Sequence, residues 1–109
     1  MQFNQQDDAY QELASILESA GYTVEQIADA AYYGYEGIRK AAALAGNPKS
    51  YPPWEQLDPD FLSGLCTTAQ EVALGRDVTA HLPQNSGEYA VMWLFAARVR
   101  NYLKERCRH

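Results

Sequence analysis

The segment Tyr51-Pro52-Pro53-Trp54-Glu55-Gln56-Leu57 constrains this chain most, because it cannot belong to a helix. Each proline ring fixes φ and removes a backbone hydrogen-bond donor, and the residue before a proline is pushed out of the helical region. Tyr51 and Trp54 are therefore held in a nearly fixed geometry between two helix-patterned halves. Two roles fit such a turn: a plug for the core, or the lip of a binding site.

Before the turn, apolar residues recur at spacings of three and four, which predicts two amphipathic helices. The first is predicted over residues 5–20, with Gly21 in the C′ position that follows many helices. The second is predicted to start after Thr23, which forms a capping box with Gln26, and to stop at Gly46-Asn47-Pro48. The apolar stripes are Tyr10, Leu13, Leu17 and Ala20 in the first helix, and Val24, Ile27, Ala28, Ala31, Tyr35, Ile38, Ala42 and Ala45 in the second.

Two more helices are predicted after the turn. Asp58 as N-cap with Pro59 in the first helical position opens the third, which ends at Gly75. Asn85 with Glu88 three residues later opens the fourth, which runs to about residue 106. The stripes are Leu62, Leu65, Cys66, Ala69, Val72 and Ala73 in the third helix, and Tyr89, Met92, Trp93, Ala96, Val99 and Leu103 in the fourth. The sequence thus predicts an all-α bundle of about four helices, in which the last three form the core and the aromatic turn closes one end.

Length and composition point to one soluble domain over residues 1–109, since the chain is long enough for one core and too short for two. The longest apolar run, residues 90–97, is too short to span a bilayer, and the first 20 residues have no apolar signal segment. Cys66 and Cys107 lie far apart and have no metal-ligand spacing. We therefore expect a cytoplasmic protein without a disulfide framework.

The net charge of −5 is unevenly distributed: residues 1–30 hold six carboxylates and no Lys or Arg, whereas a basic C-terminal tail, residues 98–109, holds five basic side chains. Clustered arginines suit a phosphate or nucleic-acid contact. Alternatively, the first and last helices pack antiparallel with a solvated charged face. We favour the helix packing and expect no nucleic-acid binding, because the acidic protein as a whole repels a polyanion.

The motifs of common enzyme classes are absent from this sequence. It has no glycine-rich phosphate loop, no G-x-S-x-G, no H-E-x-x-H and no C-x-x-C. His81 lies in a predicted loop and His109 ends the chain, so neither has clustered partners, and Cys66 lies on an apolar stripe where thiols are inert. We expect a protein that is not an enzyme and that has no metal site or cofactor.

The predicted binding site lies where the edge of the second helix meets the aromatic turn. It is bordered by Tyr35, Glu36 and Arg39 from the helix and by Tyr51 and Trp54 from the turn. A small planar or anionic ligand would stack on Trp54 or Tyr51 and be oriented by Arg39, with Glu36 holding the guanidinium. Alternatively, Tyr32, Tyr33 and Tyr35, each considered alone, simply fill a small core and its rim.

Two glycines on the same helix support a close approach there. Gly34 and Gly37 each cost up to about 1 kcal/mol relative to Ala in a helix. A neighbouring helix or a ligand that comes close to the backbone would explain why they are tolerated.

The same residues resemble the RyR domain, the small helical repeat of ryanodine receptors that is also found in bacterial and phage proteins. The resemblance covers about residues 27–93 of an RyR-like region at about 24–97. Matching positions are Glu36, Arg39, Gly46, Trp54 and Trp93. Tyr35 and Ala90 stand where the family has histidines, and the family's later Gly-Trp-x-Tyr-Gly segment is absent. The resemblance implies a ligand-sensing or partner-binding module, for nucleotide-like molecules among others, without catalytic activity.

A second function also fits the sequence: a small acidic protein, of the phage or accessory type, that acts by binding a host protein or by self-assembly into a homo-oligomer. The chain has eight tyrosines, a residue that offers large contact area at low entropic cost. Its acidic first half could also mimic a polyanion. The partner is thus either a small molecule or a protein.

Overall fold

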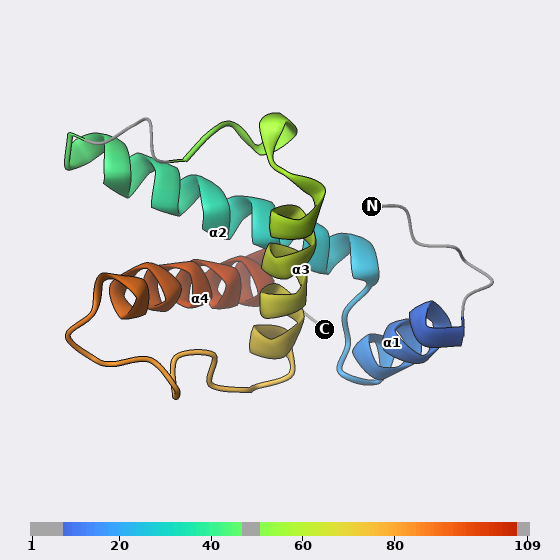
Figure 1. Ribbon diagram of the computed structural model, residues 1–109. Helices are drawn as coiled ribbons and strands as arrows, with labels where there is room; N and C mark the ends of the chain where they lie inside the picture. Colours follow the sequence, from blue (N-terminus) through green and yellow to red (C-terminus); the bar gives the residue numbers. More distant parts are fainter. Residues whose placement is uncertain (1–7, 47–50, 107–109) are drawn as a thin grey trace.

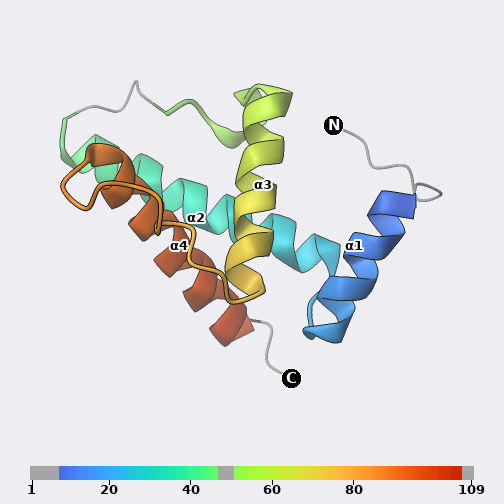
Figure 2. The ribbon, with the colours of Figure 1, turned by 60° about the horizontal axis from the view of Figure 1, so that its bottom comes forward.

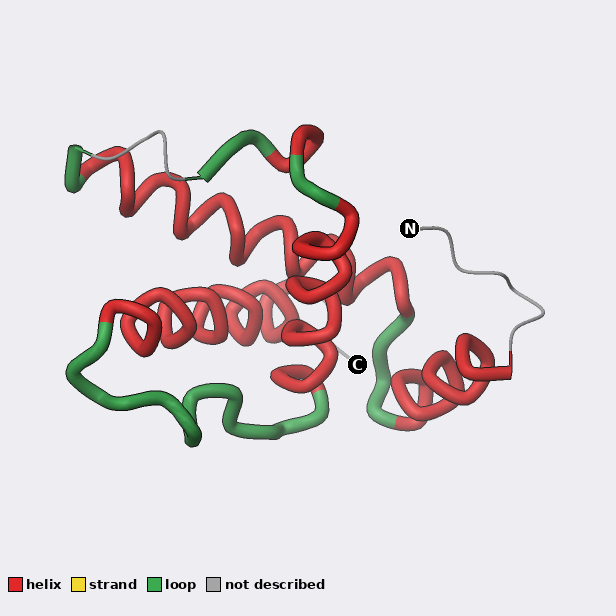
Figure 3. The backbone as a smooth tube through the Cα atoms, viewed as in Figure 1, coloured by secondary structure: helices red, strands yellow, loops and turns green. Residues whose placement is uncertain are grey.

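The computed structural model describes residues 8–46 and 51–106, and within these residues the chain is helical with no strand (Figure 3). The helices are α1 (Asp8–Ser19), α2 (Val24–Leu44), α3 (Pro59–Ala73) and α4 (Gly87–Arg106). A 3₁₀ turn, η2 (Trp54–Gln56), lies in the aromatic segment. The predicted all-α fold class with four helices is confirmed.

The long helices α2 and α4 lie side by side, and α3 crosses both of them (Figures 1 and 2). α1 stands to one side, next to the start of α2, and contributes the wholly buried Leu17. The prediction that helices two to four form the core is correct for every buried side chain except Leu17. The buried apolar side chains are Leu17, Ile27, Ala30, Ala31, Tyr35, Ile38, Ala69, Val72, Phe95, Ala96, Val99 and Leu103.

The helix ends before the aromatic turn follow the predicted local chemistry. The Thr23 hydroxyl accepts a hydrogen bond of 3.1 Å from the Gln26 amide, and the Gln26 side chain accepts one of 2.9 Å from the Thr23 amide. Gly21 has a φ of 95°, and the Tyr22 amide donates back to the Leu17 carbonyl, which is the Schellman arrangement. Ala20 and Ala45 are exposed rather than part of the stripes, because α1 and α2 end just before them.

The two later caps differ from the prediction. Asp58 precedes Pro59 as expected, but its side chain makes no capping hydrogen bond. α4 is capped by Ser86 instead of Asn85: the Ser86 hydroxyl accepts a hydrogen bond of 3.1 Å from the Tyr89 amide. Ser86 directly precedes the first helical residue, where an N-cap side chain can reach the amides of the first turn.

The inner face of α4 was predicted wrongly at Trp93, which is 54% exposed, whereas Phe95 is buried. Residues 90–97 are apolar on all sides, so spacing alone cannot select a face. Packing against α2 decides which face of α4 is buried, because a β-carbon at Gly34 would lie 2.8 Å from the Phe95 ring. The missing side chain of Gly34 makes room for Phe95 between the helices.

The antiparallel packing of the first and last helices was also predicted wrongly, since α1 does not lie along α4 (Figure 1). The basic tail is helical up to Arg106, and Arg98 packs on α2. Its guanidinium carbon lies 4.1 Å from the centre of the Tyr33 ring, and its Nε donates a 3.2 Å hydrogen bond to the Tyr33 carbonyl. Gly37 permits this, because a β-carbon there would collide with the Arg98 side chain. The close approach predicted at both glycines is thus made by a neighbouring helix.

Some predicted features lie outside the described residues. They are the start of the first helix at residues 5–7, the Asn47-Pro48 stop signal and the end of the basic tail at residues 107–109. The side chains of Tyr10 and Leu13 are likewise not among those described.

Candidate functional site

Tyr35, in the middle of α2, holds the aromatic turn against this helix. Its side chain is fully buried, and its hydroxyl donates a 2.6 Å hydrogen bond to the carbonyl oxygen of Pro52. Burial raises the pKa of this phenol, and the nearby Arg39 partly offsets the effect. The phenol therefore stays protonated and remains a donor to the turn.

Arg39, one helical turn further along α2, makes a second connection to the same segment. Its Nε donates a 3.2 Å hydrogen bond to the carbonyl oxygen of Tyr51. Its Nη1 lies 3.1 and 3.0 Å from the two carboxylate oxygens of Glu36. The hydrogen bond to Glu36 raises the pKa of Arg39. Glu36 thus positions the guanidinium, which holds the backbone of the turn against α2.

The aromatic rings of the turn pack around Tyr35. The centres of the Tyr51 and Trp54 rings lie 6.3 and 6.0 Å from the centre of the Tyr35 ring. Phe61, from the first turn of α3, lies 6.1 Å from it in an edge-on arrangement. The structure therefore brings together all five side chains that were predicted as a site, and it adds Phe61. The sequence carried a signal for Phe61, which lies four residues before Leu65 on the apolar stripe of the third helix.

An apolar cavity of about 210 Å³ lies behind this ring cluster, between α2, α3 and α4. It is lined by Tyr35, Ile38, Tyr51, Phe61, Leu65, Thr68, Val91, Met92 and Phe95. The Thr68 hydroxyl donates to the Gly64 carbonyl, and the Tyr35 hydroxyl donates to the Pro52 carbonyl, so both of these polar groups are already hydrogen-bonded within the protein. Two neighbouring hollows of about 320 and 490 Å³ also have Tyr51 in their walls. Tyr51 thus lies in the walls of all three hollows.

The polar and reactive side chains near this cavity are engaged or protonated. The Tyr35 phenol and the Arg39 guanidinium are engaged in the turn, and burial raises the pKa of the Cys66 thiol, which keeps it in its unreactive form. Among the described residues, acidic, histidine and cysteine side chains form no group of three that could hold a metal ion. What remains is an apolar cavity behind a rigid aromatic lip.

Comparison with protein-family models, curated proteins and solved structures finds no match for this chain. The resemblance to the RyR domain stays a prediction. Within the described residues, no helix combines the length and apolarity that crossing a membrane requires.

Proposed function

We propose that this chain is a non-enzymatic binding module that takes a small planar ligand at the aromatic turn. The supporting observation is the apolar cavity of about 210 Å³ that has Tyr35, Tyr51 and Phe61 in its walls. Apolar cavities of about 150 Å³ bind benzene-sized molecules, so one or two rings would fit. Aromatic walls add edge-to-face contacts with a planar ligand.

The five predicted residues have distinct roles in this proposal. Tyr51 and Trp54 present ring surfaces, and Tyr35 forms the floor. Glu36 and Arg39 hold the turn in place. The Arg39 side chain is 33% exposed, and its Nη2 takes part in none of its described hydrogen bonds. An anionic group on the ligand would bind there, next to the Tyr51 backbone that Arg39 contacts.

Titration calorimetry with indole and benzoate tests the proposal, because the two probes share a planar ring and differ in charge. Filling the cavity by Leu65→Phe, or removing its wall by Tyr51→Ala, should weaken both probes. Arg39→Gln should weaken benzoate alone. Leu44→Ala is the matched control, because Leu44 is 91% exposed and lies on α2, the helix that carries Arg39. The proposal would be contradicted if neither probe showed saturable binding. It would also be contradicted if all four variants bound each probe with the same affinity.

A protein partner or a second copy of the chain is the other candidate. The side chains of Tyr32 and Phe61 are 45% and 46% exposed, and the Tyr32 ring lies edge-on, 5.4 Å from the Trp54 ring centre. Exposed aromatic side chains are enriched at protein interfaces. Light scattering over a range of concentrations should then show self-association that Tyr32→Ala and Phe61→Ala reduce, or a pull-down should retain a protein in the same variant-dependent way. A strict monomer that retains no protein would exclude this candidate.

A further inference from the structure

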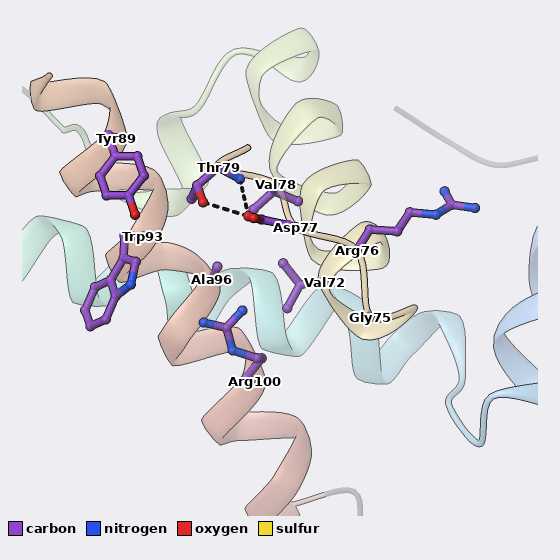
Figure 4. A pocket seen from close by; sticks show the side chains of 10 residues that line it. All are labelled: Val72, Gly75, Arg76, Asp77, Val78, Thr79, Tyr89, Trp93, Ala96 and Arg100. Atoms are coloured by element: carbon purple, nitrogen blue, oxygen red, sulfur yellow. Dashed lines mark hydrogen bonds between the residues drawn. The ribbon is translucent and has the colours of Figure 1, made fainter. Parts of the chain in front are cut away.

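Another hollow, of about 390 Å³, lies at the opposite end of α3 from the aromatic turn (Figure 4). It is lined by the last turn of α3, by the loop that follows, and by α4 from its first turn to Arg100. Its polar and aromatic lining residues are Arg76, Asp77, Thr79, Tyr89, Trp93 and Arg100. The volume is within the usual range of small-molecule sites, about 300–1,000 Å³.

One wall of this hollow is a single face of α4. Tyr89, Trp93, Ala96 and Arg100 follow one another at spacings of four, three and four residues, so they lie in one row along the helix. The Trp93 side chain is 54% exposed, which leaves an indole available for stacking. Figure 4 shows the rings of Tyr89 and Trp93 together at one end of the row and Arg100 at the other.

The opposite wall carries a fixed carboxylate. Asp77 Oδ1 accepts hydrogen bonds of 2.9 Å from the Thr79 amide and 2.6 Å from the Thr79 hydroxyl. These bonds, helped by the charges of Arg100 and His81, lower the pKa of Asp77. Asp77 is thus charged at neutral pH, and its Oδ2 takes part in neither bond with Thr79.

The two arginines of the hollow differ in how they are engaged. Arg76 pairs with Glu71, and in Figure 4 its side chain points away from Trp93. Arg100 forms no hydrogen bond or ion pair with any residue in the described part of the chain. Its guanidinium is close enough to Asp77 to affect that carboxylate and yet does not pair with it. A carboxylate and a guanidinium therefore face the same space beside an exposed indole.

We propose that this hollow binds the zwitterion of an aromatic α-amino acid. The ligand ammonium bridges to Asp77, its carboxylate accepts bonds from the Arg100 fork, and its ring packs on Trp93 and Tyr89. A zwitterion carries both charges that complement the two walls, and Ala96 leaves room between Arg100 and the rings. This site shares no residue with the cavity at the aromatic turn. The inference therefore goes beyond the proposed function, and the two proposals can be tested independently.

Calorimetry with phenylalanine and three analogues tests each part of the proposal. 3-Phenylpropionate lacks the ammonium, 2-phenylethylamine lacks the carboxylate, and alanine lacks the ring. Each analogue should bind at least about tenfold more weakly than phenylalanine, since a charge-assisted contact or a stacked ring contributes a tenfold factor or more.

Variants then connect each ligand group with its residue. Arg100→Ala should weaken phenylalanine and leave 2-phenylethylamine unchanged. Asp77→Asn, which keeps an oxygen for the Thr79 bonds, should weaken phenylalanine and leave 3-phenylpropionate unchanged. Trp93→Ala should weaken all three ring compounds. Arg76→Ala is the matched control, because its guanidinium is paired elsewhere, and it should change none of them.

The proposal is wrong if phenylalanine shows no saturable binding at millimolar concentrations, or if alanine binds as tightly as phenylalanine. It is also wrong if Arg76→Ala and Arg100→Ala weaken binding equally, since this would indicate only general attraction of anions. The targeted side chains lie at the surface, and a cooperative unfolding transition well above the assay temperature shows that a variant is folded, also for Asp77→Asn, which is expected to be less stable than the parent. Arg100→Lys and Trp93→Phe serve as second variants wherever Arg100→Ala or Trp93→Ala lacks such a transition.

Discussion

The Tyr35 hydroxyl lies 2.6 Å from the Pro52 carbonyl oxygen and connects the buried middle of α2 to the aromatic turn. A carbonyl next to two prolines has few backbone amides within reach, because neither proline has an N–H. The buried phenol supplies the missing donor. The turn is thus held by a specific hydrogen bond as well as by apolar packing.

Tyr35→Phe should destabilise the protein, because it removes the donor and leaves the Pro52 carbonyl without this partner. The expected loss in free energy of unfolding is about 1–2 kcal/mol, the usual effect of such a deletion. Urea denaturation followed by circular dichroism measures it. Tyr32→Phe is the control: Tyr32 is 45% exposed, and its change should stay within about 0.5 kcal/mol. Equal effects of the two variants would show that the hydrogen bond is unimportant.

Arg39→Lys should loosen the turn without unfolding the bundle. Lysine cannot contact both Glu36 oxygens and the Tyr51 carbonyl with one planar fork. The amides of Gln56 and Leu57, which donate to carbonyls within the turn, should exchange hydrogen several-fold faster. Amides in the middle of α4 should keep their rates. Uniform acceleration over the whole chain would indicate global destabilisation instead.

Gly34→Ala and Gly64→Ala should change stability in opposite directions. A β-carbon at Gly34 would lie 2.8 Å from Phe95 and 3.1 Å from Val99, an overpacking that costs about 1–3 kcal/mol and outweighs the gain in helix propensity. At Gly64 nothing lies within 4 Å, so alanine should stabilise α3 by up to about 1 kcal/mol. Thermal unfolding of the two variants in parallel checks the sign of each.

Asp77 should make stability depend on pH in acid. Its pKa is lowered in the folded state, so its contribution is complete above the unfolded pKa of about 4 and is lost as the pH falls through the folded value. Asp77→Asn should therefore be less stable than the parent at neutral pH, and the difference should shrink in acid. Urea midpoints across this range measure the effect. Thr79→Val, which removes one of the two bonds to Asp77, should show a weaker version of it. Parallel curves for the parent and Asp77→Asn would contradict this prediction.

Local chemistry made much of the fold predictable. The Thr23–Gln26 capping box, the glycines after α1 and α3, and the proline-rich turn each act through residues a few positions apart. For the same reason the five residues of the turn site could be grouped: three share the edge of one helix, and two flank the prolines. The caps at Asp58 and Asn85 were harder to predict, because several neighbouring polar side chains can compete for the same backbone amides.

The hollow beside Trp93 could be predicted only in part. The helical spacing of Tyr89, Trp93, Ala96 and Arg100 can be seen in the sequence. However, residues 90–97 are apolar on every face of the helix, so the spacing could not show that the face with Trp93 is exposed to solvent. Asp77 comes from the loop between α3 and α4, and its place opposite this row depends on contacts between residues distant in the chain.

By itself, the sequence determined that the chain is helical, where most helices begin and end, and that the turn between α2 and α3 must be rigid and aromatic. These features depend on hydrogen bonds and sterics within a few residues. Only the tertiary structure decided which face of α4 is buried, where α1 lies, and that Tyr35 and Arg39 hold the turn. Those outcomes depend on pairs that are distant in the chain, such as Gly34 with Phe95 and Gly37 with Arg98, where the absence of a side chain on one helix makes room for a side chain of another.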